Sequence, residues 1–307
     1  MRKIKFIVAV AMMTALAAFV LAGCSSSASS SSASASGSSA SVASASASAS
    51  AASASASAAS ASTSSAAANP TKLLTVGFDS AYPPYGFVGD DGNYTGFDLD
   101  LAAEVCKRNG WEFKAEPIDW DAKDALINSG TITCIWNGFT IEGREDSYTF
   151  SDPYMLNEQV VVVKAGSDIK ALADLAGKTV MTQVDSAALG VLEDEEGQKA
   201  LAATFGDLQT IGDYNNAFLQ LDSGAVDAVA CDLSIAQYQI SKTADKYVQI
   251  SEPLSSEHYG VGFKKGDTDT AAAVTSTLKA MNQDGTVKTL CDKYAEYGLT
   301  YDNWILK

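Results

Sequence analysis

Residues suited to hold a small polar molecule occur at four points where an apolar segment ends. These positions are Asp79, Asn137-Gly138, Asp185-Ser186 and Asp232. Each apolar segment is short and reads as a buried strand. Ligands of open α/β sheets bind outside the carboxyl ends of the strands. The sequence therefore predicts that carboxylates, an amide and a hydroxyl meet in one cleft.

Several other chemistries are excluded by composition. The chain holds one histidine, His258, and five cysteines without a close Cys-x-x-Cys pair. Zinc and a histidine-based nucleophilic triad are therefore not expected, and no Gly-rich phosphate loop is evident. The net charge of −16, from 21 Lys+Arg against 37 Asp+Glu, argues against nucleic acid as a partner and suits a soluble monomer. We expect no metal, no cofactor and no catalytic residue.

The elements that must position these residues occur twice along the chain. In each half a strand leads into Asp-Ser-Ala, and a second strand follows a helix that ends near Ser-Gly. A third pair begins at Ser151-Asp152-Pro153 and Ser251-Glu252-Pro253 and continues into an extended segment. This repetition predicts two α/β lobes joined by two crossing strands. The expected strands cover residues 73–78, 131–136, 160–164, 178–184, 225–231 and 261–264.

Helices are expected between these strands. Residues 96–109 carry apolar side chains at helical spacing and end at Asn109-Gly110, a typical stop signal. Residues 213–221 and 271–281 have a similar pattern. We assign residues 71–157 and 259–307 to lobe 1 and residues 158–258 to lobe 2.

The first 70 residues differ from the rest in composition. Residues 1–23 have a basic start, an apolar run and small residues, which is typical of a secretory signal peptide. They end in Leu21-Ala22-Gly23-Cys24, which resembles a bacterial lipobox, so we expect a lipid on Cys24; a signal peptide with a chance cysteine is the alternative. Residues 25–68 are almost entirely Ser and Ala. Together, residues 24–70 therefore read as a lipidated cysteine followed by a disordered tether.

Four motifs carry a family resemblance, and they are found at residues 77–85, 96–102, 134–144 and 150–154. In this order they resemble the polar-amino-acid solute-binding proteins of ABC importers, family 3 of the bacterial extracellular solute-binding proteins. The resemblance covers residues 72–307. It implies a type II periplasmic-binding-protein fold that closes on one free amino acid. It also implies transmembrane permease subunits as partners and a lipid-anchored location on the extracytoplasmic face of the cell membrane.

The same resemblance implies roles for individual residues. Arg144 matches the arginine that binds the ligand's carboxylate, which suits a planar guanidinium. Asp232 matches the aspartate that binds the ammonium group. From the residues alone, a surface arginine and a helix-capping aspartate are the alternatives. The other implied ligand-binding residues are Asp79, Tyr82, Trp120, Asn137, Gly138, Phe139, Thr140, Gln183 and Ser186.

The sequence differs from the family at Asp185, where glycine is usual. Two other functions also remain open. The first is an enzyme similar to the periplasmic prephenate- or arogenate-type (cyclohexadienyl) dehydratases, which need an acid that protonates a leaving hydroxyl. The second is a receptor lipoprotein that uses the same fold.

Overall fold

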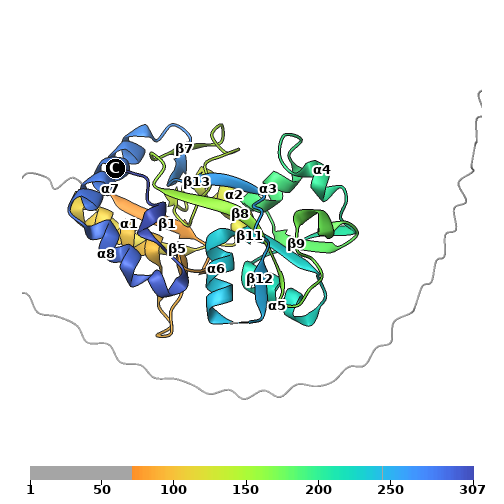
Figure 1. The fold of residues 1–307 in the computed structure, drawn as a ribbon. Coiled ribbons are helices and arrows are strands. Elements are labelled where there is room, and N and C mark those ends of the chain that lie inside the picture. The colour runs from red at the N-terminus through yellow and green to blue at the C-terminus, as the bar shows by residue number, and fades with distance from the viewer. Residues whose placement is uncertain (1–70, 244) are drawn as a thin grey trace, which may run out of the picture. The chain divides into compact units, whose positions relative to one another are not determined.

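The computed structural model describes residues 71–243 and 245–307 (Figure 1). The predicted signal peptide, the lipidation site Cys24 and the tether up to residue 70 lie outside the described residues. In the part that is described, no helix combines the length and the apolar character needed to cross a membrane.

Lobe 1 is built on a five-stranded sheet of order β5-β1-β6-β14-β7. Its strands are β1 (Leu73–Phe78), β5 (Glu112–Pro117), β6 (Cys134–Ile135), β7 (Tyr148–Phe150) and β14 (Gly262–Lys264). β1 pairs in parallel with β5 and β6, whereas β14 runs antiparallel to β6 and β7. A smaller sheet contains β2 (Ala81–Tyr82), β3 (Gly86–Val88) and β4 (Tyr94–Thr95).

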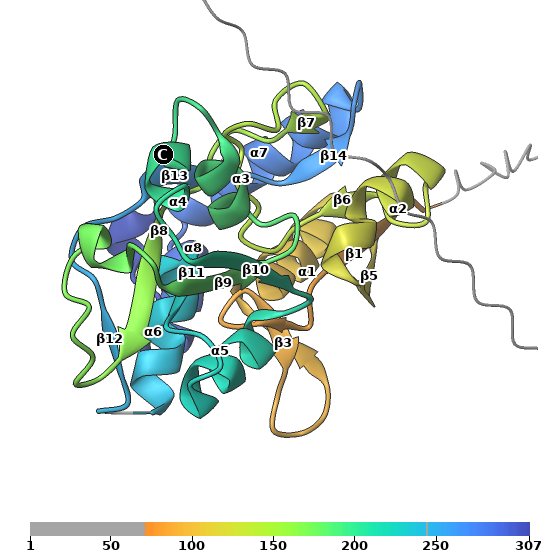
Figure 2. The same cartoon turned by 90° about the vertical axis from the view of Figure 1, so that its right-hand side faces the viewer.

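Helices cover this sheet because each presents an apolar face to it. They are α1 (Phe97–Asn109), α2 (Lys123–Ser129), α7 (Thr268–Gln283) and α8 (Thr286–Lys293), with short 3-10 turns at Trp120–Ala122, Ala295–Tyr297 and Tyr301–Asn303. α1 buries Phe97, Leu101 and Val105 and ends where Gly110 adopts the left-handed conformation. Figure 2 shows α1 beside β1 and β5.

Lobe 2 is also an α/β unit, built on a second sheet with its own strands and helices. Its sheet has the order β10-β9-β11-β8-β12. The strands are β8 (Met155–Lys164), β9 (Thr179–Gln183), β10 (Asp207–Ile211), β11 (Ala228–Asp232) and β12 (Tyr247–Gln249). The helices are α3 (Ala187–Glu193), α4 (Lys199–Ala202), α5 (Tyr214–Ser223) and α6 (Leu233–Lys242), with a 3-10 turn at Leu172–Leu175.

Two antiparallel strands connect the lobes. β8 pairs with β13 (Ser255–Tyr259), in a register that sets Ser255 opposite Gln159 and Tyr259 opposite Met155. Beyond this pair β8 continues into the sheet of lobe 2, while Tyr259 forms a bridge to Thr140 of lobe 1. The prediction of two α/β lobes joined by two crossing strands is thus confirmed. The lobe borders at 157/158 and 258/259 stay a prediction, and both fall inside this strand pair.

Several observed strands are shorter than predicted. β9 covers Thr179–Gln183 of the predicted 178–184, β11 covers Ala228–Asp232 in place of 225–231, and β14 covers Gly262–Lys264 of 261–264. The largest difference is at residues 131–136, where β6 covers only Cys134–Ile135. The amides of Thr131 and Ile132 bond instead to the carbonyl of Leu126, at distances of 3.0 and 3.4 Å. They complete the end of α2, where Gly130 is left-handed. The need to close the helix thus delays the start of the strand.

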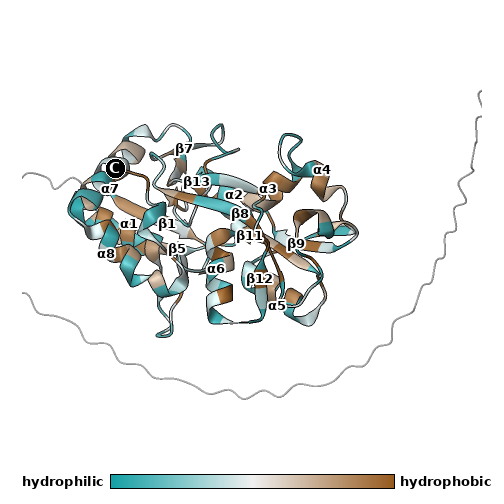
Figure 3. Cartoon of the chain, in the orientation of Figure 1, coloured by the Kyte–Doolittle hydropathy of each residue, from teal (hydrophilic) through white to brown (hydrophobic). Residues whose placement is uncertain are grey.

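Within the described residues, the apolar side chains form three clusters. The largest extends from lobe 1 through the crossing strands into lobe 2, where it includes Phe218 and Val229. A second cluster lies within lobe 2 and contains Val161, Leu175 and Val180, and a third lies in lobe 1 around Phe139. In Figure 3, hydrophobic colour is found on parts of the strands and helices, and hydrophilic colour marks other parts of both. Four cysteines of the described part are buried and free, namely Cys106, Cys134, Cys231 and Cys291.

Gly96, directly before α1, provides a test of the close approach between the start of this helix and the main chain of Tyr85. It has φ 145°, and a Cβ atom there would lie 2.1 Å from the carbonyl oxygen of Tyr85. Gly96→Ala is therefore expected to lower the free energy of unfolding by more than about 2 kcal/mol, because the main chain must shift. Gly190→Ala in α3 is the control, since no described atom lies within 4 Å of its new Cβ. Urea unfolding measures both, and equal effects would contradict the close approach.

Candidate functional site

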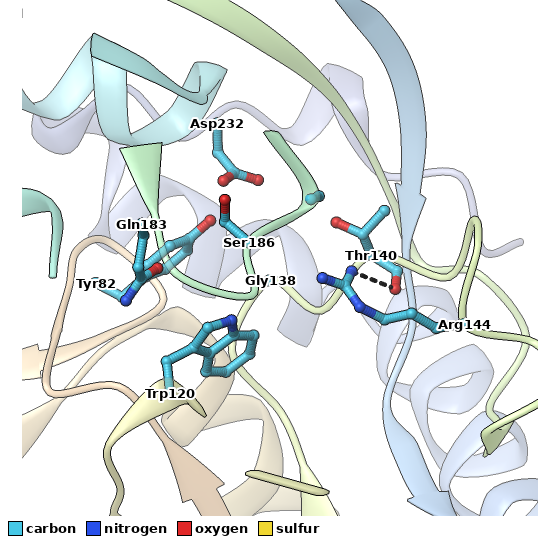
Figure 4. A pocket seen from close by; sticks show the side chains of 9 residues that line it. Tyr82, Trp120, Gly138, Thr140, Arg144, Gln183, Ser186 and Asp232 are labelled. Carbon is cyan, nitrogen blue, oxygen red and sulfur yellow. Dashed lines mark hydrogen bonds between the residues drawn. The ribbon is translucent and has the colours of Figure 1, made fainter. Parts of the chain in front are cut away.

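A cavity lies between the two lobes and collects polar residues from both (Figure 4). The unoccupied space around these residues amounts to about 230 Å³, which includes space that is open to solvent. Its lining residues are Tyr82, Trp120, Gly138, Thr140, Arg144, Gln183, Ser186, Ala187 and Asp232.

The lining side chains lie at the ends of strands or in the turns that follow them. Gln183 is the last residue of β9, and Asp232 is the last residue of β11. Ser186 precedes α3 and accepts a hydrogen bond from the amide of Leu189 at 3.1 Å. Trp120 begins the turn that follows β5. The carboxyl ends of strands from both lobes thus face one another, as the α/β layout predicts.

Arg144 enters the cavity with an oriented guanidinium group. Nη1 donates a hydrogen bond to the carbonyl of Thr140, and Nη2 donates to the carbonyl of Asp185, both at 3.2 Å. The ring of Phe139 lies 5.0 Å from the guanidinium carbon. None of the ion pairs in the described part of the chain includes Arg144. Since a guanidinium group has five N–H donors, it retains donors for an anion.

Asp232 is the acidic group of the cavity and is only 3% exposed. Its Oδ1 atom accepts hydrogen bonds from Asn157 Nδ2, Gln159 Nε2 and the hydroxyl of Tyr259, at 2.9, 2.9 and 2.7 Å. In the described structure its side chain makes no capping bond to α6, although it occupies the N-cap position. The helix-capping alternative is therefore not supported. A buried carboxylate with only neutral donors favours a cation beside it.

A contact between the lobes closes one end of the cavity. Gln183 Nε2 donates a hydrogen bond to Asp79 Oδ2 at 2.7 Å, and Asn137 Oδ1 accepts one from the amide of Asp79 at 2.7 Å. Burial raises the pKa of Asp79. Asp79 also lines a neighbouring opening, together with Asp119 and Asp213. The acidic group of Asp79 thus lies behind Gln183, the residue that lines this end of the cavity.

Eight of the predicted ligand-binding residues line the cavity, and three do not. Asp79 and Asn137 stand behind the lining, as described above. Phe139 was predicted as an aromatic wall, but it is fully buried and packs against Trp120 and Tyr148. The residues on either side of it, Gly138 and Thr140, line the cavity. The chain turns at the left-handed Gly138, and Phe139 after this turn packs towards the core.

Asp98 supports the site and had no predicted role. It is fully buried, and its Oδ2 accepts a hydrogen bond from the amide of Gly138 at 2.6 Å and from the hydroxyl of Tyr154 at 2.8 Å. Gly138 adopts φ 57°, a conformation that suits glycine. Burial raises the pKa of Asp98 to about 7. Its place in the first turn of α1 suggests only a charge at a helix N-terminus, so the sequence does not signal this contact.

Asp185 joins the lobes at the other end of the cavity. Its carbonyl accepts hydrogen bonds from Trp120 Nε1 and Arg144 Nη2, both at 3.2 Å. Its carboxylate lies 3.3 Å from Lys123 Nζ, and Lys123 is only 4% exposed. Asp185 has φ 54°, the left-handed conformation that explains why glycine is common there. An unexpected partner, Lys123, explains how an acid is accommodated at this position.

No group of His, Cys, Asp and Glu within residues 71–243 and 245–307 is arranged to hold a metal ion. The fold and the cleft define a two-lobed solute-binding protein. Residues 74–297 match the family described as bacterial extracellular solute-binding proteins, family 3, and the chain belongs to this family.

Relatives of known ligand extend this comparison. The chain is 33% identical to the L-cystine-binding protein TcyJ of Escherichia coli K12 over 224 residues, which is 72% of this chain and 82% of TcyJ. The crystal structure of Tv2483 bound to L-arginine has a TM-score of 0.70 and 30% identity, covering 76% of this chain and 93% of that chain. An ABC uptake transporter substrate binding protein from Streptococcus pneumoniae with bound histidine has a TM-score of 0.69 and 32% identity, covering 72% and 92%.

Asp98 gives a prediction about pH. Its pKa is raised in the folded protein, so the folded state holds a proton that the unfolded state has lost between about pH 4 and pH 7. This contribution to stability is present at low pH and is lost as the pH rises through 7. Asp98→Asn removes it. As the pH rises from 4 to 7, the free energy of unfolding of the wild type should therefore fall relative to that of the variant, by up to about 1.4 kcal/mol for each pH unit. Unfolding curves at four pH values test this, and a constant difference would contradict it.

The pair Lys123 and Asp185 gives a second prediction. Asp185→Asn keeps the left-handed backbone but leaves the buried ammonium group of Lys123 without its counter-charge, so it should destabilise the protein. Lys123→Met removes the buried charge and keeps the apolar stem, so it should be neutral or slightly stabilising. Because Asp185 is half exposed, we expect the two variants to differ by only about 1–2 kcal/mol. Urea unfolding gives the order, and the reverse order would contradict this reading.

Proposed function

We propose that this protein captures one free polar amino acid between its lobes and delivers it to the transmembrane subunits of an ABC permease. The observation that carries the proposal is the pairing of Arg144 and Asp232 across one small cavity. A free amino acid has a carboxylate and an ammonium group on the same carbon. Arg144 offers donors to the carboxylate, and Asp232 offers a negative charge to the ammonium group. The two side chains reach the cavity from different lobes, so the ligand would hold the lobes together.

The rest of the cavity fits the carbon skeleton and side chain of such a ligand. Tyr82 and Trp120 supply aromatic surface, and the ring of Tyr214 lies 6.0 Å from that of Tyr82. We propose Gly138, Thr140 and Ser186 as further contacts of the two charged ends. Gln183 forms the end wall that the ligand's side chain meets, and Asp79 holds Gln183 from behind through its hydrogen bond. Asn137 and Phe139 would support this surface without contacting the ligand, Asn137 through its bond to the Asp79 amide and Phe139 by packing against Trp120.

The relatives support the ligand class and the mode of action. The related proteins named above bind L-cystine, L-arginine and histidine, and the last of them belongs to an ABC uptake transporter. Two of them are described as binding proteins and the third is bound to an amino acid, which favours binding over the dehydratase alternative. We therefore propose that the chain has no catalytic residue. From its net charge of −16 we also propose that it acts as a monomer.

We also propose that the protein is anchored outside the cytoplasm. The signal peptide of residues 1–23 would direct export, a lipid on Cys24 would attach the chain to the membrane, and the Ser- and Ala-rich tether would let the lobes reach the permease. Membrane fractionation of the wild type and of Cys24→Ser tests this anchoring.

A thermal-shift screen against the twenty amino acids, L-cystine and ornithine tests the ligand class. A ligand at 100 times its Kd should stabilise the protein by about 2.7 kcal/mol. Arg144→Lys should weaken binding at least about tenfold, since it loses the two-pronged contact, and Asp232→Asn should weaken it similarly. Arg108→Lys is the matched control, because Arg108 pairs with Glu104 and Asp284 at the surface. If no compound shifts the melting temperature, the proposal fails.

A further inference from the structure

A second buried carboxyl group lies directly behind Asp232. It belongs to Glu257 of β13, which is 2% exposed. Two side-chain amides bridge the two acids. Asn157 Nδ2 is 2.9 Å from Asp232 Oδ1 and 2.8 Å from Glu257 Oε1, and Gln159 Nε2 has the same two distances. The two carboxyl groups therefore share donors within one buried cluster.

Glu257 also contacts the cavity through a hydroxyl group. Thr140, which lines the cavity, donates a hydrogen bond from Oγ1 to Glu257 Oε1 at 3.0 Å. This bond directs the proton of the hydroxyl towards Glu257, so that the oxygen lone pairs of Thr140 stay free for a donor in the cavity. Both groups that we propose for the ammonium end of the ligand, Asp232 and Thr140, are thus linked to Glu257.

The cluster contains negative charge but no cation. No ion pair among the described residues includes Asp232 or Glu257. Gln159 Oε1 is buried and has no donor within the described structure. The cluster therefore contains a hydrogen-bond acceptor without a donor. An ammonium group has three N–H donors.

The neighbouring charges are few. Asp232 of β11 is the acidic neighbour of Glu257. The side chains of β8 that contact Glu257 are the neutral amides of Asn157 and Gln159. The opening beyond Thr140 adds Glu142, Arg144 and Asp194. The tyrosines nearby, Tyr82 and Tyr259, stay neutral because burial raises the pKa of each far above its ordinary value. Burial, followed by repulsion from Asp232, raises the pKa of Glu257 to about 8. At neutral pH Glu257 therefore holds its proton in the unliganded protein.

We propose that Glu257 is a positioning residue that couples capture of the ligand to release of one proton. The ammonium group arrives beside Asp232 and Thr140, and its charge favours the ionised form of Glu257. The O–H bond of the Glu257 carboxyl group breaks, the electron pair stays on the carboxylate, and the proton leaves to water. This inference rests on the proposed function, because it needs an ammonium-bearing ligand in the cavity.

A dependence of affinity on pH follows from this coupling. Below about pH 8 the free protein must lose a proton to reach the preferred bound state, so affinity should rise as the pH increases from 6 to 8. Each unit by which the ligand lowers the pKa of Glu257 corresponds to a tenfold gain in affinity across this window. Above it, Glu257 is already ionised and the gain should stop.

Isothermal titration calorimetry at pH 7, in phosphate and in Tris, measures the released protons. The ligand is whichever of the twenty amino acids, L-cystine or ornithine gives the largest thermal shift. We expect the wild type to release up to one proton and Glu257→Gln to release clearly less, with an affinity that stays flat from pH 6 to 8. Any proton from the ligand itself is common to both proteins and cancels in the comparison. His258→Gln changes the adjacent, exposed ionisable residue and should behave as the wild type.

Three results would overturn the inference. If Glu257→Gln releases as many protons as the wild type, another group is responsible, while the observed binding would leave the proposed function intact. If the variant does not fold, the test uses the binding enthalpy of the wild type alone. An enthalpy that is equal in both buffers from pH 6 to 8 then rules out the coupling. If no amino acid binds to the wild type, the proposed function fails and this inference fails with it.

Discussion

The cleft depends on two charged groups, the partly exposed Arg144 and the buried Asp232, that have no ion-pair partner among the described residues. Arg144 is oriented by two carbonyl groups, and Asp232 is held by neutral donors from Asn157, Gln159 and Tyr259. Neutral partners fix the position of a charged group without cancelling its charge. A small molecule with both charges can satisfy both groups at once, and in a medium of low dielectric constant that attraction is strong. Most of the surrounding structure serves to keep these two groups apart and oriented.

Backbone geometry provides this orientation at two points. Gly138 is held in a left-handed turn by Asp98, a buried acid on α1. Asp185 adopts a left-handed conformation in lobe 2 and presents its carbonyl to Trp120 and Arg144 of lobe 1. One turn therefore shapes the cavity from within a lobe, and the other joins the lobes. Both turns follow strand ends, where the chain leaves the sheet and its polar groups need partners.

The sequence predicted the parts that depend on local pattern or on family motifs. Strand ends located Asp232, Ser186 and the Asn137-Gly138 turn, and motif order identified Arg144. Contacts that depend on register between distant segments could not be read in this way. The partnership of Asn157 with Glu257 exists because β8 and β13 pair with these residues opposite each other. Lys123 meets Asp185 only when two lobes come together. Phe139 was misplaced because a motif names a position but not the side towards which its side chain points.

The crossing strands connect binding with motion. Asn157 and Gln159 lie on β8, and Glu257 and Tyr259 lie on β13. The three side chains that donate hydrogen bonds to Asp232 Oδ1, and the neighbouring Glu257, therefore come from the strands that join the lobes. A change of charge at Asp232 or Glu257 therefore alters hydrogen bonds within the hinge itself. Hinge strands need only a few residues to absorb a domain movement. On the proposed function, the ammonium group would bind beside side chains of the two crossing strands, so the ligand's charge would act directly on the strands that join the lobes.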